Sequence, residues 1–282
     1  MTEIFKYENR KIYKINNNYY DFISNKPIII DEEKLIFWKL SSNLINKYKK
    51  IFSNDIHYFH KKLKNKSIAV VGPSPYLENK NLGNYIDSFD YVVRINKGYK
   101  LTENPKDYGS RTDILYHVVN QHNENGGPLN NNLLNQYNIK YVIGCYPLLD
   151  YDENTSFDNI GTIRDYFQLE RDINNFYKIH KKKYKKFENK IGTRPNAGTI
   201  CIWDLLKSPC SKIYITGFSL FKGGYSKLYR DKIDGNDNLE EAVLKRIKTN
   251  HDQEKIKSFY QEKLLNNPKV ELNDELKFIL KN

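Results

Sequence analysis

Short apolar runs that recur from residue 67 onward constrain the fold of this chain most. They are rich in Val, Ile and Tyr and lack strict alternation of polar and apolar residues, which is typical of strands covered on both faces. Helical patterns separate or follow them, most clearly Ala197–Leu206 and Asp252–Leu265. This order predicts an α/β fold, a Rossmann-like, mostly parallel sheet flanked by helices. The predicted strands are Ser67–Gly72, Tyr91–Ile95, Asp113–Val119, Tyr141–Cys145, Lys212–Thr216 and Lys269–Leu272.

The patterns also predict how the chain is divided. We expect residues 1–65 to form a helical and aromatic extension packed on the core, with one apolar helix around Glu32–Ile51. Residues 66–282 should form the α/β domain, with a helical lid insert at about 147–190. The insert contains a basic stretch, 171–190, which predicts a lid helix with its lysines outward. Binding of this helix to a membrane surface is the alternative. Its expected apolar face comprises Ile173, Phe176, Tyr177, His180, Tyr184 and Phe187.

Charge and composition limit the function classes. The net charge is +12, which favours an anionic partner such as a nucleic acid, a membrane surface or a phosphorylated small molecule. The aromatic content of 14% argues against a disordered chain. We expect a cytoplasmic protein, because the start resembles no secretory signal and no apolar run reaches the ~20 residues of a membrane span. Cys145, Cys201 and Cys210 should then be reduced, buried thiols.

Small and polar residues follow several of the predicted strands. Gly72, Pro73 and Ser74 follow the first strand, Asn96 the second, and Gly217 and Phe218 a later one. Parallel sheets bind ligands beyond the carboxyl ends of their strands. A helix start in the stretch 195-PNAG-198 adds Asn196, Ala197 and Gly198, whose backbone N–H groups suit a phosphate or carboxylate. The sequence therefore predicts an anion-binding site at this edge of the sheet.

Two stretches resemble a known family. The run IAVVGPSPYLENKNLGNYIDSFDYVVRINKGYK resembles the large sialylmotif of the family-29 sialyltransferases, and RPNAGTICIWDLLKSPCSKIYITGFS resembles their small sialylmotif. The order of these elements is also similar to the bacterial family-42 enzymes. The resemblance covers residues 67–119 and 191–260. It implies a sialyltransferase-type (GT-A variant) fold and inverting transfer of sialic acid from CMP-sialic acid to a glycan or glycolipid hydroxyl. CMP-Kdo, with a Kdo transferase activity, is the alternative donor.

The resemblance also assigns the donor site. It implies that Asn96 and the helix start contact the donor, and it places His117 where family-42 enzymes have a nucleotide-contacting asparagine. Three departures stand out. Pro73 and Tyr76 replace the family's first-turn asparagines, and Asn196-Ala197 replaces its Ser-Thr pair. Cys210 matches one partner of the animal disulfide, but the other position is Ile68, so that disulfide cannot form.

His251 matches the family's catalytic histidine, which deprotonates the acceptor hydroxyl. Thr249 or Asn250 is a good N-cap, which would place His251 in the first turn of the last long helix. There the helix dipole would keep the imidazole neutral, as a general base requires. The spacing departs from the family, because Glu254 follows at three positions instead of four. A surface or capping histidine is the alternative interpretation.

Tyr225 and Tyr229 are the candidates for stabilising the leaving phosphate, as tyrosines in this region do in family-42 enzymes. Lys222 and Arg230 could add positive charge. A CMP leaving group carries one phosphate, which hydroxyl and backbone donors can stabilise, so we expect no metal and no cofactor. Two other function classes compete with this one. Nucleic-acid binding would be driven by charge and aromatic residues, but the sequence has no recognisable nucleic-acid-binding module and its lysines are spread along the chain, so we expect no nucleic-acid partner. Glycan binding without catalysis is the other alternative.

Overall fold

The computed structural model divides the chain into two compact units, Met1–Ser53 and Asn54–Asn282. It describes residues 2–7, 10–15, 18–23 and 26–30 of the first unit. Of the second unit it describes 56–119, 126–146, 169, 172–220, 223–230, 238, 241 and 251–282. The predicted helix Glu32–Ile51 lies outside these residues, as do Lys222, Thr249 and Asn250. Within the described residues, no helix has the length and apolar content needed to cross a membrane.

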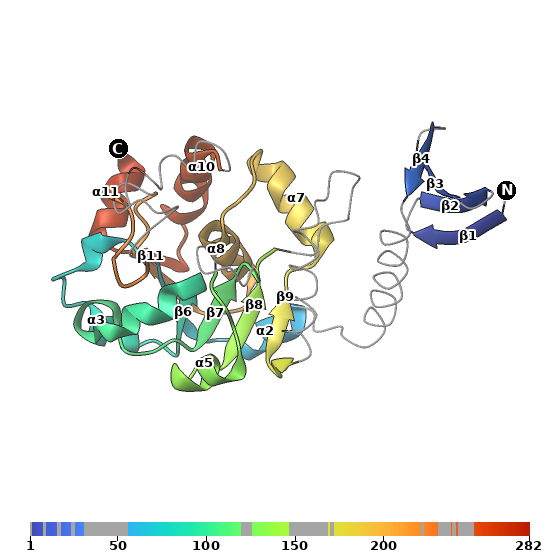
Figure 1. The fold of residues 1–282 in the computed structure, drawn as a ribbon. Helices are drawn as coiled ribbons and strands as arrows, with labels where there is room; N and C mark the ends of the chain where they lie inside the picture. Colours follow the sequence, from blue (N-terminus) through green and yellow to red (C-terminus); the bar gives the residue numbers. More distant parts are fainter. Residues whose placement is uncertain are drawn as a thin grey trace. The chain divides into compact units, whose positions relative to one another are not determined.

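The described residues of the first unit form a four-stranded antiparallel sheet in sequential order (Figure 1). Its strands are β1 (Thr2–Tyr7), β2 (Arg10–Ile15), β3 (Asn18–Ile23) and β4 (Lys26–Ile30). The prediction of a helical extension is therefore wrong for residues 2–30, where aromatic and β-branched residues favour strands. The unit boundary also lies earlier than residue 65. The reason is helix α2 (Ile56–Lys62), which buries Ile56 and Phe59 in the core of the second unit.

The second unit contains a seven-stranded parallel sheet, which confirms the predicted fold class (Figure 1). The strand order is β11-β10-β5-β6-β7-β8-β9. Every neighbouring pair is parallel. All six predicted strands are present, with ends that agree within two residues. The strands are β5 (Ser67–Val71), β6 (Tyr91–Ile95), β7 (Ile114–His117), β8 (Tyr141–Gly144), β9 (Phe176–Lys178), β10 (Lys212–Thr216) and β11 (Val270–Leu272).

Helices cover both faces of this sheet. Ile68 and Val70 of β5 pack in one cluster with residues of α2, α7 (Lys181–Ile191), α8 (Ala197–Lys207), α10 (Gln253–Leu264) and α11 (Asp274–Lys281). Ala69 and Val71 point to the other face, where short helices pack. The sheet is thus buried on both sides, as its unalternating sequence predicts. The shorter helices are η1 (Pro75–Leu77), α3 (Gly83–Asp87), η2 (Asn96–Glu103), α4 (Pro105–Tyr108) and α5 (Asn131–Gln136).

The basic stretch 171–190 differs from its prediction. Phe176 and Tyr177 belong to β9, which pairs with β8 as the edge strand of the sheet. The helix begins only at Lys181, and the exposed His180 is its N-cap, accepting from Lys182 N–H. A single lid helix over 171–190 is therefore wrong, because pairing with β8 holds its first part as a strand. The predicted apolar residues other than His180 are nevertheless buried.

Candidate active site

Three adjacent strands end at one edge of the sheet, where the chain reverses its direction of travel across the sheet. Strands β5 to β9 run outward in sequence order, and β10 then returns to the other side of β5. Val71 pairs with Thr216 on one side and Arg94 on the other, so the carboxyl ends of β10, β5 and β6 lie together. In open α/β sheets, a crevice at such a switch point is the usual ligand site.

The segments that follow β5 and β10 cross in backbone contact. A Cβ atom on Gly72 would collide with the carbonyl oxygen of Gly217, and one on Gly217 would collide with Gly72. Gly217 also has φ +77°, which side chains rarely adopt. Ser74 N–H donates to Gly217 O at 3.0 Å, which holds the two segments together. Both glycines are therefore needed to build this edge.

The side chain of Tyr76 also holds the segment that follows β10 in place. Its hydroxyl oxygen accepts from Gly217 N–H at 2.7 Å and from Phe218 N–H at 3.2 Å. The hydroxyl in turn donates to Asn273 Oδ1 at 3.2 Å. Burial raises the pKa of Tyr76 well above its usual value, so the hydroxyl keeps its proton. Tyr76 thus takes a positioning role that its sequence position alone did not predict.

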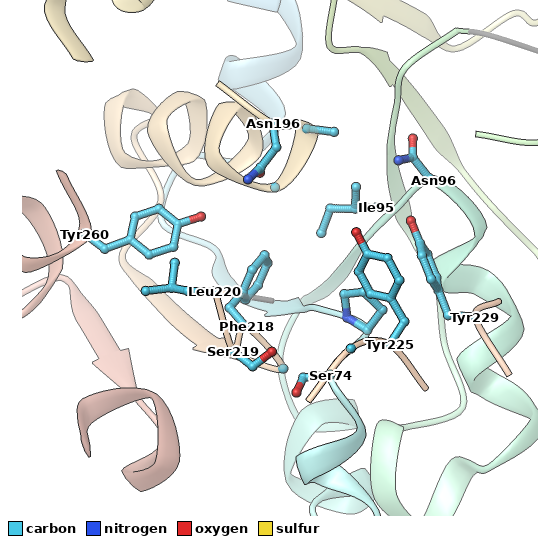
Figure 2. Close-up of a pocket in the computed structure, with 15 residues that line it drawn as sticks. Ser74, Ile95, Asn96, Asn196, Phe218, Ser219, Leu220, Tyr225, Tyr229 and Tyr260 are labelled. Carbon is cyan, nitrogen blue, oxygen red and sulfur yellow. The ribbon is translucent and has the colours of Figure 1, made fainter. Parts of the chain in front are cut away.

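A cavity of about 630 Å³, a volume that includes space open to the solvent, lies beyond these strand ends (Figure 2). Figure 2 shows Tyr260 at the left of the view, Asn196 at the top, and Asn96, Tyr225 and Tyr229 at the right. Among the residues that the structure describes, none that lines the cavity carries a charged side chain. The lining residues are Pro73, Ser74, Ile95, Asn96, Asn196, Ala197, Gly198, Gly217, Phe218, Ser219, Leu220, Gly224, Tyr225, Tyr229 and Tyr260.

Asn96 presents its amide NH₂ group toward this cavity. Its Oδ1 accepts from Val118 N–H at 3.0 Å, so the carbonyl side of the amide is already bonded. The backbone of Asn96 has φ +50°, a left-handed conformation that Asn tolerates better than most residues. Asn96 is 7% exposed. The remaining Nδ2 can therefore donate to a bound ligand.

Asn196 is arranged in the same way at the start of α8. It is the N-cap, and its Oδ1 accepts from Thr199 N–H at 2.9 Å and lies 3.1 Å from Thr199 Oγ1. Its Nδ2 is left for the cavity. The free N–H groups at the helix start and the helix dipole add further affinity for an anion. A Cβ on Gly198 would lie 2.7 Å from the Phe218 ring, so a larger residue there would require that ring to move.

Hydroxyl groups complete the lining. Ser74 is 2% exposed, and its Oγ has no hydrogen-bond partner among the described residues. Tyr225 and Tyr229 reach the cavity because Ser226 N–H donates to Pro73 O at 2.8 Å, which ties their segment to the turn after β5. Their ring centroids are 5.1 Å apart. The Arg230 guanidinium lies 5.8 Å and 5.3 Å from the two ring centroids.

Three predicted site residues do not line the cavity. Gly72 lies just beneath it, at the crossing. His117 is fully buried, and its Nδ1 accepts from Val119 N–H at 2.9 Å. Burial lowers the pKa of His117 to about 4, so it is a neutral core residue. The third, His251, lies on the segment before α10.

His251 precedes the helix instead of lying in its first turn. The N-cap is Asp252, whose side chain accepts from Lys255 N–H. His251 Nδ1 lies 2.8 Å from the carbonyl oxygen of Arg194, two residues before Asn196. A carbonyl only accepts, so Nδ1 carries the proton and Nε2 keeps a basic lone pair. The pKa of His251 is lowered, first by burial, and the positive charge of Arg194 lowers it further.

Several lining residues escaped sequence reasoning. Ser219, Leu220 and Gly224 follow Gly217 and Phe218 closely in the chain, so the strand-end argument could have been extended to them. Tyr260 was predicted only as part of an apolar stripe, and its hydroxyl gave no separate signal. Cys145, Cys201 and Cys210 are free and buried, as predicted. Among the described residues, no three His, Cys, Asp or Glu side chains are grouped so as to hold a metal ion.

The match to a sequence family agrees with the sialylmotif resemblance. No curated protein sequence matches the chain. Among solved structures, a mammalian sialyltransferase in complex with Gal-beta-1-3GalNAc-ortho-nitrophenol is 17% identical, with a TM-score of 0.46 and 86% of each chain covered. The sialyltransferase CstII from Campylobacter jejuni in complex with cytidine-5'-monophosphate is 15% identical, with a TM-score of 0.37. That match covers 65% of this chain and 75% of the CstII chain. The sequence profile of glycosyltransferase family 29 (sialyltransferase) matches residues 22–271. The chain therefore belongs to glycosyltransferase family 29, the sialyltransferases.

Proposed function

We propose that this glycosyltransferase transfers sialic acid from CMP-sialic acid to a hydroxyl group of a glycan acceptor. The observation that carries the proposal is the set of hydrogen-bond donors in the cavity. Asn96 and Asn196 both have their carbonyl oxygens bonded, which leaves two NH₂ groups for a ligand. The α8 start and the Ser74 hydroxyl add donors, and the described part of the lining contains no carboxylate side chain. Such a site suits the phosphate of CMP and the carboxylate of the sugar.

His251 is the proposed general base. Its Nδ1–H is held by Arg194 O, and a lowered pKa keeps Nε2 unprotonated at neutral pH. The acceptor O–H gives its proton to Nε2 as the acceptor oxygen forms a bond to the anomeric carbon. The bond from that carbon to the CMP phosphate oxygen breaks, and its electron pair leaves with CMP. A single displacement from the side opposite the phosphate inverts the anomeric configuration.

Tyr225 and Tyr229 are proposed to stabilise the phosphate as it leaves. Both line the cavity on the side of Asn96 in the view of Figure 2, and Arg230 lies near both rings. Two phenol donors and one nearby cation can offset the negative charge that develops on a monophosphate. We therefore propose that catalysis needs neither a metal ion nor a cofactor.

The nucleotide specificity tests the proposal directly. CMP should stabilise the protein against thermal unfolding more than CDP, UDP or GDP, because binding to the folded state raises stability by mass action. A transfer assay with CMP-sialic acid and CMP-Kdo then identifies the donor sugar. Transfer of Kdo alone would replace sialic acid with Kdo in the proposal. Equal stabilisation by all four nucleotides, or by none, would contradict a CMP-dependent transferase.

We also propose peripheral contact with an anionic membrane through α7. The helix exposes five lysines, and Glu188 is the single acid in its range. Co-sedimentation with vesicles containing phosphatidylglycerol should be lost when Lys186 and Lys190 are replaced by Glu, but retained with the same changes at the exposed Lys106 and Lys281. Equal binding by the two variants would refute a role of α7. The exposed lysines are Lys182, Lys183, Lys185, Lys186 and Lys190.

A further inference from the structure

A buried chain of hydroxyl groups leads from α10 to the donor cavity. The Tyr260 hydroxyl lies 3.1 Å from Thr199 Oγ1, which lies 3.1 Å from Asn196 Oδ1. Thr199 is fully buried and Tyr260 is 1% exposed, so bulk water does not compete for these groups. This series of hydrogen bonds ends at the amide of Asn196, which lines the cavity.

The direction of each hydrogen bond follows from the groups involved. An amide oxygen only accepts, so the single proton of Thr199 Oγ1 is donated to Asn196 Oδ1. Thr199 Oγ1 must then accept from the Tyr260 hydroxyl. Burial raises the pKa of Tyr260 well above its usual value, which keeps the donating proton in place. A helical Thr hydroxyl commonly turns back to the carbonyl four residues earlier, and the Tyr260 bond opposes that rotation.

We propose that Tyr260 and Thr199 are positioning residues that keep the NH₂ group of Asn196, and not its carbonyl oxygen, facing the anionic groups of the donor. This inference rests on the proposed function. Rotation of the amide by half a turn would place its NH₂ group against two donors, Thr199 N–H and Oγ1–H, and would aim a carbonyl oxygen at an anion. The two hydroxyl groups therefore determine that Asn196 presents a hydrogen-bond donor, and not an acceptor, to the cavity.

The same arrangement joins the two halves of the reaction. Tyr260 belongs to α10, and His251 lies directly before that helix. One helix thus follows the proposed base and orients a group that binds the donor. Because Asn196 would contact the donor both before and during transfer, loss of its orientation should change donor KM and leave kcat nearly unchanged.

Calorimetric CMP binding and steady-state kinetics of variants test this role. Tyr260→Phe and Thr199→Val should each weaken CMP binding by roughly two- to tenfold, the range expected for one hydrogen bond. Donor KM should rise in parallel, with kcat within about twofold of wild type. Thr199→Ser keeps the hydroxyl group and should therefore bind CMP with wild-type affinity. The matched control is Tyr184→Phe, which removes a buried hydroxyl that contacts Glu188 and not the cavity.

Two combinations separate positioning from a general loss of stability. Tyr260→Phe should add nothing to Thr199→Val, because its effect passes through Thr199. In an Asn196→Asp background Thr199→Val should also add nothing, because the two oxygens of a carboxylate are equivalent. Wild-type CMP affinity in both single variants, or a further loss in the Asp background, would overturn the proposal.

Failure of the proposed function has a different signature. Wild-type protein that binds no CMP would overturn the CMP donor and leave the orientation of Asn196 to be tested with inorganic phosphate. Weaker phosphate binding by Thr199→Val and Tyr260→Phe would then support the positioning role. Unchanged phosphate binding, or none to wild type, would overturn it.

Discussion

Replacing Asn96 by aspartate and by alanine separates its proposed contact with the donor from its structural role. Aspartate keeps an oxygen for Val118 N–H and tolerates the left-handed backbone at φ +50°. It replaces the cavity-facing NH₂ group with a negatively charged oxygen. Alanine removes both the donor and the acceptor. The comparison therefore tests whether the amide nitrogen, and not the side chain in general, binds CMP.

The structure gives the expected magnitudes. Loss of a hydrogen bond to a charged phosphate costs about 1.5–3 kcal/mol, a weakening of CMP binding of roughly 10- to 150-fold. The aspartate variant should show this loss with little change in stability. In the alanine variant the orphaned Val118 N–H costs about 1–3 kcal/mol, and the left-handed backbone about 1–2 kcal/mol. We therefore expect alanine, but not aspartate, to lower the free energy of unfolding by about 2–5 kcal/mol.

Calorimetry with CMP and urea denaturation measure the two effects separately. An aspartate variant that binds CMP as tightly as wild type would refute the assignment of Nδ2 as a ligand donor. An alanine variant as stable as wild type would show that the Val118 bond and the backbone conformation have been given too much weight.

Four further predictions concern the reaction and the pH response. His251→Ala should lower turnover by roughly 10²- to 10⁴-fold with unchanged CMP affinity. The control His180→Ala should leave turnover nearly unchanged. The wild-type rate should fall as pH drops through the pKa of His251, which is lowered below 6.5. Tyr225→Phe and Tyr229→Phe should each lower kcat, by roughly 10²-fold for a lost phosphate donor. EDTA should leave activity within about twofold. As the pH falls from 6.5 to 4, the free energy of unfolding should fall by up to about 3 kcal/mol. The reason is that His117 takes up a proton in the unfolded chain over this range, whereas in the folded chain it does so only near its pKa of about 4. Urea denaturation of His117→Gln should not show this loss.

Each of these has a contrary outcome. Near-wild-type turnover of His251→Ala would move the search for the base to Asp252 and Glu254. Tyrosine variants with raised donor KM and normal kcat would show binding of the ground state instead of leaving-group stabilisation. Restoration of EDTA-treated enzyme by manganese would indicate a metal-dependent reaction. A His117→Gln variant with the same pH dependence as wild type would attribute the acid response to other groups.

The parallel sheet could be predicted because its signal is local. The strands are covered on both faces, so their apolar runs are continuous and bounded by Gly, Pro or Asn. The edge strand β9 could not be predicted in this way. Phe176 and Tyr177 would be buried whether the segment formed a helix or a strand. The segment is a strand because it pairs with the edge of β8, and that contact is not visible in the local sequence.

The residues that line the cavity could be predicted in part, but the orientation of their side chains could not. Strand ends and the sialylmotif resemblance predicted Asn96 and Asn196 as ligand-binding residues, and both line the cavity. Which atom of each amide faces the cavity depends on Val118 and Thr199, and those contacts exist only in the folded chain. His251 shows the same limit. Its neutral state was predicted from a helix dipole, whereas in the structure burial and the positive charge of Arg194 lower its pKa, and the hydrogen bond to the Arg194 carbonyl acts in the opposite direction.

The position of β10 between β5 and β11 has a consequence for how the protein folds. Pairing of Thr216 with Val71 closes a loop that contains β6, β7, β8 and β9, so it is among the contacts with the highest entropic cost of closure. The crossing of Gly72 and Gly217 forms only when that loop closes. Partly folded chains that contain only the strands from β5 to β9 should therefore have no donor cavity, and recovery of CMP binding should follow the slowest phase of refolding, after most of the helical signal has returned.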